Sequence, residues 1–232
     1  MRAAAILLAA TLLALPSVAQ SAGTIEIAPT TLDLSPGKAG LLYLANNGHA
    51  PLLIQIQPMD WTQNDGANAL APSNALIASP PLLRIAPRQR QVVRVLADGD
   101  PSGRETEYRL LVSELPNGAQ TASAVNVLLQ FNIPVFVARA SVTPAAAWSA
   151  IAKDDKLALT LRNNGYAALK ISGLTVARDN AASAPVSCGL TYILPGAQHA
   201  WTVPWNGAVS VRVATRDERS GMPIEADIPV LR

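Results

Sequence analysis

The segment Val125–Val135 has a large apolar residue at every odd position and mostly polar residues between them. A period of two places successive side chains on opposite faces of an extended chain, so it predicts a long, half-buried β-strand. Pro134 has no backbone N–H, which favours a sheet edge for the end of this strand. Apolar edge strands are normally protected by charge, yet no charged residue lies between Ala124 and Ala138. We therefore expect this edge to pair with another protein.

Composition limits the classes of function. The 232 residues suffice for one large or two ordinary domains. Hydrophobic residues make up 50% of the chain and charged residues 15%, which favours a well-filled core over disorder. The net charge of +2 gives no support for a nucleic-acid partner or for an anionic membrane surface. An aromatic content of 4% argues against a surface that stacks on bases or sugars.

The first 22 residues have the pattern of an export signal. Arg2 precedes the apolar run Ala3–Leu15, which is interrupted by Thr11 alone, and small residues follow. This pattern predicts a Sec-type signal peptide that is cleaved after Ala19 or Ala22. The run is shorter than the ~20 residues that a membrane span requires. We expect the mature protein to be exported and soluble.

Short strand-like runs recur along the chain, separated by residues that favour turns. In the first half they are Thr24–Leu34, Leu41–Ala45, Leu52–Gln57, Gln91–Ala97, Glu107–Leu115 and Val125–Val137. In the second half they are Lys156–Arg162, Ala168–Ala177, Leu190–Leu194, Ala200–Pro204, Val209–Thr215 and Ile224–Leu231. No window of helical length has a 3.6-residue apolar period. The pattern predicts an all-β protein made of antiparallel β-sandwiches.

Two features indicate how the runs divide into domains. The alanine-rich stretch Ser141–Ala150 contains Pro144 and has the composition of a linker. The tripeptide Asn-Asn-Gly follows an alternating run in each half, at residues 46–48 and 163–165. The repetition favours two sandwiches of the same type, although turn chemistry alone would also produce it.

The residue patterns of catalytic and metal sites do not occur. His49, His199 and Cys188 lack the spacing of metal ligands. There is no Gly-x-Ser-x-Gly elbow, no phosphate-binding glycine loop and no His-Glu-x-x-His motif. We expect no catalytic residue, no metal, no cofactor and no small-molecule substrate. Cys188 is the single cysteine, so no intramolecular disulfide can form, and we expect it to be buried and inert.

Over essentially the whole mature chain, the sequence resembles the periplasmic chaperones of pilus and fimbria assembly by the chaperone–usher route, and the most specific motifs lie in the first domain, in the family's order. They are the first strand Ile25–Leu34, the W-x-Q-x-D-G turn at Trp61–Gly66, the proline-rich signature Ser79–Val95 and the E..YR motif at Glu105–Pro116. Arg88 departs from the signature, because the family has glycine there. The Trp-x-Gln and Tyr-Arg features resemble the archaic or alternative branch more than the best-known branch.

The resemblance implies two immunoglobulin-like β-sandwich domains in an L-shaped arrangement, over residues 23–140 and 141–232. It also implies a periplasmic protein that binds pilin or fimbrial subunits, prevents their aggregation and delivers them to an outer-membrane usher. The mode is donor-strand complementation, in which the last strand of the first domain pairs with an incomplete subunit sandwich. The sequence leaves open whether the free protein covers this edge by self-association.

The resemblance also implies which side chains meet the subunit. The donor residues are Val125, Val127, Leu129, Phe131 and Ile133, and each would contribute ~1.5–3 kcal/mol on burial, before ordering costs. The alternative is that this face packs in the protein's own core, which applies above all to Ile133 and Val135.

In the best-known branch of the family, an arginine on the first strand and a lysine late in the donor strand anchor the subunit's C-terminal carboxylate, and this chain departs from that pattern. The aligned positions are Thr31 and Pro134, neither of which carries a positive charge. Arg109 is the best replacement, because it lies on the predicted preceding strand and a guanidinium binds carboxylates through two parallel hydrogen bonds. Arg94 is the second candidate. The alternative for Arg109 is a structural salt bridge with Glu107 or Glu114.

Another class of function is a structural or adhesive two-sandwich protein, such as a pilus subunit. A pilin should carry an alternating apolar extension at its N-terminus and usually lacks a second complete domain. Here the candidate edge lies in the middle of the chain, at Val125–Val135. The sequence therefore favours the chaperone.

Overall fold

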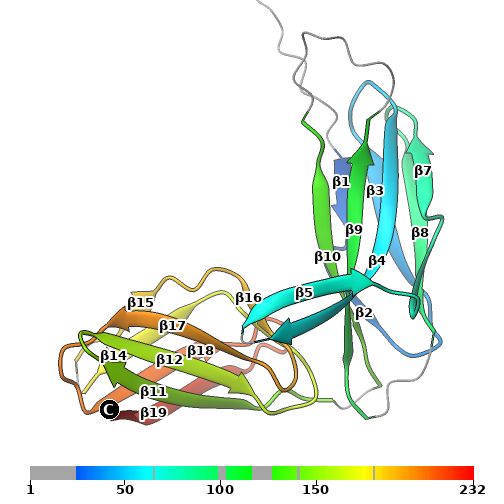
Figure 1. Ribbon diagram of the computed structural model, residues 1–232. Coiled ribbons are helices and arrows are strands. Elements are labelled where there is room, and N and C mark those ends of the chain that lie inside the picture. The colour runs from blue at the N-terminus through cyan, green and yellow to red at the C-terminus, as the bar shows by residue number, and fades with distance from the viewer. Residues whose placement is uncertain (1–24, 65, 99–102, 117–126, 140–141, 180) are drawn as a thin grey trace, which may run out of the picture.

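The computed structural model describes residues 25–64, 66–98, 103–116, 127–139, 142–179 and 181–232. Within these residues all regular structure is β-strand, and no helix is present that could span a membrane. The strands form two sandwiches set at an angle, which gives the molecule an L shape (Figure 1). The predicted fold class is confirmed. The predicted signal peptide, residues 1–22, lies outside the described residues.

The described part of the first domain contains ten strands in two sheets. They are β1 (Ile25–Ala28), β2 (Leu32–Leu34), β3 (Gly40–Asn46), β4 (Leu52–Asn64), β5 (Ala67–Pro72), β6 (Leu76–Ser79), β7 (Leu82–Ile85), β8 (Arg90–Ala97), β9 (Thr106–Leu115) and β10 (Gln130–Val137). One sheet has the order β1-β3-β8-β6, and the other has β2-β10-β9-β4-β5 with β7 also paired to β4. Alternate residues of the two sheets, among them Leu42, Ile54 and Leu110, meet in a closed apolar core.

The run predicted as one strand at Thr24–Leu34 is two strands in different sheets. β1 pairs with β3 in the first sheet, and β2 pairs in parallel with β10 in the second. Pro29 lies between them and has no N–H for a ladder, so the chain can leave one sheet there and enter the other. This crossover places β2 beside the end of β10.

The predicted edge strand is open over part of its length. β10 pairs with β9 from Gln130 to Val137, whereas β2 covers its other side only from Val135 to Val137. In the described residues the outer edge of β10 is therefore unpaired from Gln130 to Pro134. Figure 1 shows that β10 borders the inner angle of the L.

The second domain contains nine strands in the described residues. They are β11 (Ala146–Lys153), β12 (Lys156–Asn163), β13 (Leu169–Ile171), β14 (Leu174–Arg178), β15 (Ala184–Val186), β16 (Thr191–Ile193), β17 (Gln198–Pro204), β18 (Ser210–Arg216) and β19 (Pro223–Leu231). Seven form a sheet of order β15-β14-β18-β19-β11-β12-β17, and β13 pairs with β16. Cys188 is half-buried against the core of this domain. β10 ends at Val137 and β11 begins at Ala146. The expected boundary at residues 140–141 lies outside the described residues and stays a prediction.

The prediction that Ser141–Ala150 is a linker is wrong for its second half. β11 occupies Ala146–Lys153 and pairs with both β12 and β19. Its inward residues include Ala150 and Ala152, which are buried. Alanine has low strand propensity and little apolar area, so the composition concealed a central strand.

The Asn-Asn-Gly repetition marks equivalent positions in the two domains. Asn46 is fully buried, donates from Nδ2 to the carbonyls of Ala50 and Ile85, and accepts from the Gly48 N–H. Asn163 does the same with Ala167, Ile193 and Gly165. A buried side chain with the same set of backbone partners in both domains goes beyond a shared turn, and it supports two sandwiches of one type.

Candidate functional site

An apolar segment directly precedes the open edge of β10. Val127, Leu128 and Leu129 are 65%, 44% and 37% exposed, which is unusual for three consecutive large apolar residues. Leu129 continues the ladder beside β9, since its carbonyl accepts from the Glu114 N–H at 2.8 Å. Unpaired backbone groups and exposed apolar side chains thus lie on the same stretch of chain.

The structure divides the predicted donor residues into three groups. Val127 and Leu129 are exposed, as a donor requires. Phe131 is half-buried against the first domain's core, and Ile133 is 5% exposed within that core. Ile133 is therefore not available to a partner, and the alternative of packing in the protein's own core holds for it. Val125 lies outside the described residues.

Arg109 on β9 lies directly opposite Pro134 on β10 in the antiparallel ladder. Its Nη1 donates to the Asn132 carbonyl at a long 3.5 Å. Its guanidinium carbon lies 3.6 Å from the centroid of the Trp61 ring and 5.0 Å from that of Tyr192. Burial lowers the pKa of Arg109 to about 10, so it stays cationic at neutral pH.

Neither of the alternative partners, Glu107 and Glu114, forms an ion pair with Arg109 in the described structure. Among the described residues Arg109 makes no ion pair within 4 Å. The Glu114 carboxylate faces the backbone N–H of Leu129 at 3.5 Å. Burial, reinforced by the charge of Glu105, raises the pKa of Glu107 to about 8, and its buried Oε1 has no hydrogen-bond partner in the described structure. Glu107 is therefore mostly protonated at neutral pH and cannot neutralise Arg109.

Arg94 does not join this site. It lies exposed on β8, opposite Leu41 and Ser79, in the sheet that does not contain β10. The structure thus separates the two predicted anchor candidates and brings Arg109 alone to the candidate donor strand. Arg88, in the preceding turn, has a φ of +61°, a conformation that glycine adopts without strain. This explains why glycine suits the position in the signature.

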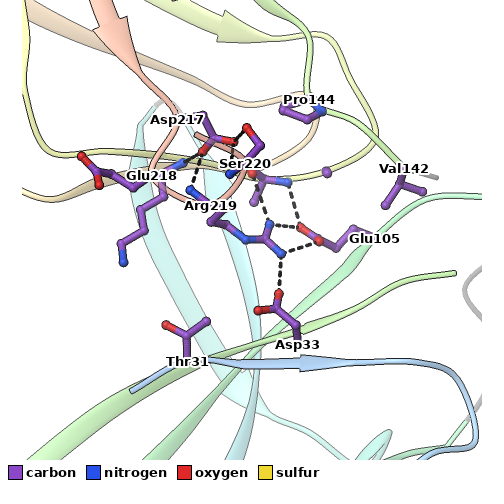
Figure 2. A pocket seen from close by; sticks show the side chains of 12 residues that line it. Thr31, Asp33, Glu105, Val142, Pro144, Asp217, Glu218, Arg219 and Ser220 are labelled. Carbon is purple, nitrogen blue, oxygen red and sulfur yellow. Dashed lines mark hydrogen bonds and ion pairs between the residues drawn. The ribbon is translucent and has the colours of Figure 1, made fainter. Parts of the chain in front are cut away.

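Thr31 lines a pocket of about 430 Å³ between the domains. Figure 2 shows its centre, where Arg219 of the second domain binds both Glu105 and Asp33 of the first. The charged residues that line the pocket are two cations, Lys170 and Arg219, and four carboxylates. The carboxylates are Asp33, Glu105, Asp217 and Glu218. An acidic surplus disfavours a carboxylate ligand, so the pocket is a poorer anchor site than Arg109.

Several residues of the domain junction could not be assigned a role from the sequence. Trp61, Phe136, Ala168 and Leu194 form a separate apolar cluster where the domains meet, with Tyr192 packed against it. Gln63 donates to the Tyr192 carbonyl and accepts from the Leu194 N–H. The sequence presents Trp61 and Gln63 as a motif, but no local signal identifies Tyr192 as their neighbour or Arg219 as the partner of Glu105.

Comparison with known proteins identifies the family. Residues 24–142, about half of the chain, match the family described as "Pili and flagellar-assembly chaperone, PapD N-terminal domain". The protein belongs to this family. It is 26% identical to the chaperone protein PapD of Escherichia coli over 167 residues, which cover 69% of this chain and 66% of PapD. The predicted resemblance is confirmed.

Solved structures share the complete two-domain fold. A chain of the CsuC–CsuE chaperone–tip adhesion subunit pre-assembly complex, from the archaic chaperone-usher Csu pili of Acinetobacter baumannii, matches with a TM-score of 0.69 and 20% identity. The match covers 90% of this chain and 100% of that chain. The periplasmic chaperone SfaE matches with a TM-score of 0.57 and 16% identity over 90% of this chain and 100% of its own. At these identities the similarity establishes the fold.

Proposed function

We propose that this family member is a periplasmic chaperone that binds pilin or fimbrial subunits by donor-strand complementation and delivers them to an outer-membrane usher. The observation that carries the proposal is the geometry of β10. Within the part of the chain that the structure describes, its outer edge is unpaired from Gln130 to Pro134, exposed apolar residues precede it, and Arg109, which makes no ion pair there, lies opposite Pro134. The family assignment favours this function over that of a pilus subunit or adhesin.

Each part of the strand supplies a different interaction. The open edge offers N–H and C=O groups to a sheet that lacks one strand. Val127 and Leu129 project on one face and would enter the apolar groove of the subunit, contributing ~1.5–3 kcal/mol each before ordering costs. Ile133 is excluded from this contact because it fills the chaperone's own core.

Arg109 would bind the C-terminal carboxylate of the subunit. Leu129 precedes Pro134 by five residues, and at about 3.3 Å per residue the two positions are roughly 16 Å apart along the strand. The proposal therefore requires a subunit whose terminal carboxylate lies at one end of the groove and whose deepest apolar pockets lie about five residues away. Binding of this kind needs no catalytic group, and we infer that the protein is not an enzyme.

The test compares two adjacent leucines of the exposed segment. Leu129→Asp places a carboxylate in the groove, whereas Leu128→Asp places it on the opposite face of the strand. Each variant is co-expressed with a fimbrial subunit, and the recovered chaperone–subunit complex is measured beside the circular dichroism of the free chaperone. We expect Leu129→Asp to abolish the complex and Leu128→Asp to retain most of it, with both variants folded. Normal recovery with Leu129→Asp would remove this segment from the binding site.

A further inference from the structure

Arg109 is held by aromatic residues from both domains. Trp61 belongs to β4 of the first domain and Tyr192 to β16 of the second, and their rings meet edge to face at 5.4 Å. The guanidinium of Arg109 lies in the corner between them, 3.6 Å from one centroid and 5.0 Å from the other. Cations are attracted to the faces of both rings. Arg109, which we propose binds the subunit's carboxylate, is therefore in contact with Tyr192 of the other domain.

The position of Tyr192 is itself fixed from the first domain. The side-chain amide of Gln63 binds β16 as a neighbouring strand would, donating to the Tyr192 carbonyl at 2.8 Å and accepting from the Leu194 N–H at 2.9 Å. Asn68 on β5 accepts from both Gln63 Nε2 at 2.9 Å and Trp61 Nε1 at 2.8 Å. The Trp-x-Gln motif thus supplies the Trp61 ring itself, and through Gln63 it fixes the backbone that carries the Tyr192 ring.

The tip of the β4–β5 hairpin also contacts the second domain. Gly66 has a φ of +81°, and a Cβ at this position would lie 3.3 Å from the Gln198 carbonyl oxygen. Figure 1 shows the hairpin reaching across to β16 and β17. A glycine suits this position on both counts, because it permits the positive φ and the close approach.

This arrangement suits a carboxylate site. The guanidinium carbon lies 3.6 Å from the Trp61 ring centroid and 5.0 Å from that of Tyr192, and a guanidinium binds a carboxylate in its own plane through two parallel N–H groups. Among the described residues, the one hydrogen bond from the Arg109 side chain is the long contact to Asn132, which leaves most of the guanidinium N–H groups for a ligand. Lys170 is the other cation near Tyr192, with Nζ 5.9 Å from the ring centroid. A long side chain held in advance loses less conformational freedom when it binds.

We propose that Tyr192 is a positioning residue for Arg109. The Trp61–Gln63–Asn68 group holds Tyr192 in place, and through it the second domain contributes to the carboxylate site. The inference rests on the proposed function, because it concerns how the same site recognises a subunit's C-terminus. It assigns a purpose to the Trp-x-Gln motif, which ties carboxylate recognition to the contact between the domains.

The test separates the position of Arg109 from the binding of the subunit. The first readout is the ¹⁵N–¹H signal of Arg109 Nε, assigned with Arg109→Lys, which reports the ring current of its aromatic neighbours. The second is the affinity for a synthetic peptide of the subunit's C-terminal strand, with a free or an amidated C-terminus. Tyr192→Leu removes the ring and Tyr192→Phe keeps it. Gln63→Met removes the two hydrogen bonds from Gln63 to the backbone of Tyr192 and Leu194, while leaving the Tyr192 ring intact. The matched control is Tyr166→Leu, since Tyr166 is a 61% exposed tyrosine of the same domain.

We expect Tyr192→Leu and Gln63→Met to shift the Arg109 signal and to reduce the preference for the free carboxylate about 3- to 30-fold. Tyr192→Phe and Tyr166→Leu should leave both unchanged. An intact Arg109 signal and an intact carboxylate preference in folded Tyr192→Leu and Gln63→Met would overturn this inference alone. Equal affinity of the wild-type protein for the two peptides would instead overturn the carboxylate role of Arg109, and the inference with it.

Discussion

Glu105 of the first domain and Arg219 of the second form a two-point ion pair, with Nη1–Oε1 and Nη2–Oε2 distances of 2.8 Å each. The Glu105 side chain is 3% exposed and that of Arg219 is 18% exposed. The Ala168 N–H also donates to Glu105 Oε1, and the guanidinium lies over the ring of Phe136 at 3.7 Å. The pair therefore joins the domains through a buried carboxylate and a partly buried guanidinium.

Breaking this pair should destabilise the protein far more than breaking a surface pair. Glu105→Ala leaves Arg219 with Asp33 as its remaining acidic partner, so we expect a loss near the lower end for buried pairs, about 3 kcal/mol in the free energy of unfolding. Urea denaturation measures it. The control is Arg212→Ala, because the Arg212–Asp227 pair has side chains that are 65% and 69% exposed, and it should change stability little. Equal losses in the two variants would show that the interdomain pair has no special role.

Glu107 should make stability depend on pH between about 4.5 and 8. Its pKa is raised from 4.5 to about 8 by burial and by Glu105, against the opposing charges of Arg104 and Arg219. A raised pKa means that the native state binds the proton more tightly, so this contribution is fully present at low pH and is lost as pH rises through the window.

Glu107→Gln keeps the neutral shape and removes the titration. The difference in unfolding free energy between variant and wild type should grow in favour of the variant as pH rises, by at most about 1.4 kcal/mol per pH unit. Denaturant titrations at pH 4.5, 6, 7 and 8.5 would measure that difference. A constant difference over the whole range would show that Glu107 titrates normally.

Side-chain truncations along one face of residues 127–133 should separate effects on stability from effects on subunit binding. Ile133→Ala removes a core side chain and should cost about 2–5 kcal/mol of stability. Val127→Ala removes a 65% exposed side chain and should lower subunit affinity with little change in unfolding midpoint. Thermal denaturation and subunit binding of both variants test this. A large stability loss in Val127→Ala would mean that Val127 packs in the chaperone itself.

The same face illustrates how far sequence reasoning extends. Alternation predicted the strand that became β10, but it continues unchanged from Val127 to Val137. The pattern cannot show where this face changes from exposed to buried in the protein's own core. Large apolar residues suit both a surface that binds a partner and a core. The transition at Phe131 depends on which strands of the other sheet lie beneath it, and that is a property of the folded domain.

Local motifs were located from the sequence, but their partners were not. Trp61 and Gln63 were predicted to lie in a turn, whereas they lie near the end of the thirteen-residue strand β4. Gln63 binds Tyr192 across 129 positions, and Glu105 binds Arg219 across 114. Such pairings follow from the contact between two domains, and no short-range periodicity encodes them. The family pattern pointed to Arg109 as a candidate, because a charge is missing at Pro134, and the ladder places these two residues opposite each other. Its role as an anchor stays a prediction.

The final prediction concerns that replacement. Arg109→Ala should abolish recognition of the subunit's free C-terminus while the chaperone stays folded. Removing one partner of a desolvated charge pair commonly costs about 2–5 kcal/mol, which is ~30- to several-thousand-fold in affinity. Arg109→Lys should restore binding only in part, because an ammonium keeps the charge but loses the planar pair of N–H groups.

Two further cations serve as controls for this experiment. Arg94→Ala, on the other sheet, should have no effect, and Lys170→Ala tests the pocket that contains Thr31. Binding of each purified variant to a subunit with a free or amidated C-terminus is the measurement. Amidation should weaken the wild-type complex and leave that of Arg109→Ala unchanged, because the interaction it removes is already gone. If amidation weakens both complexes equally, the carboxylate binds elsewhere. A loss of its effect in Lys170→Ala would then place the anchor in the interdomain pocket, despite the acidic surplus there.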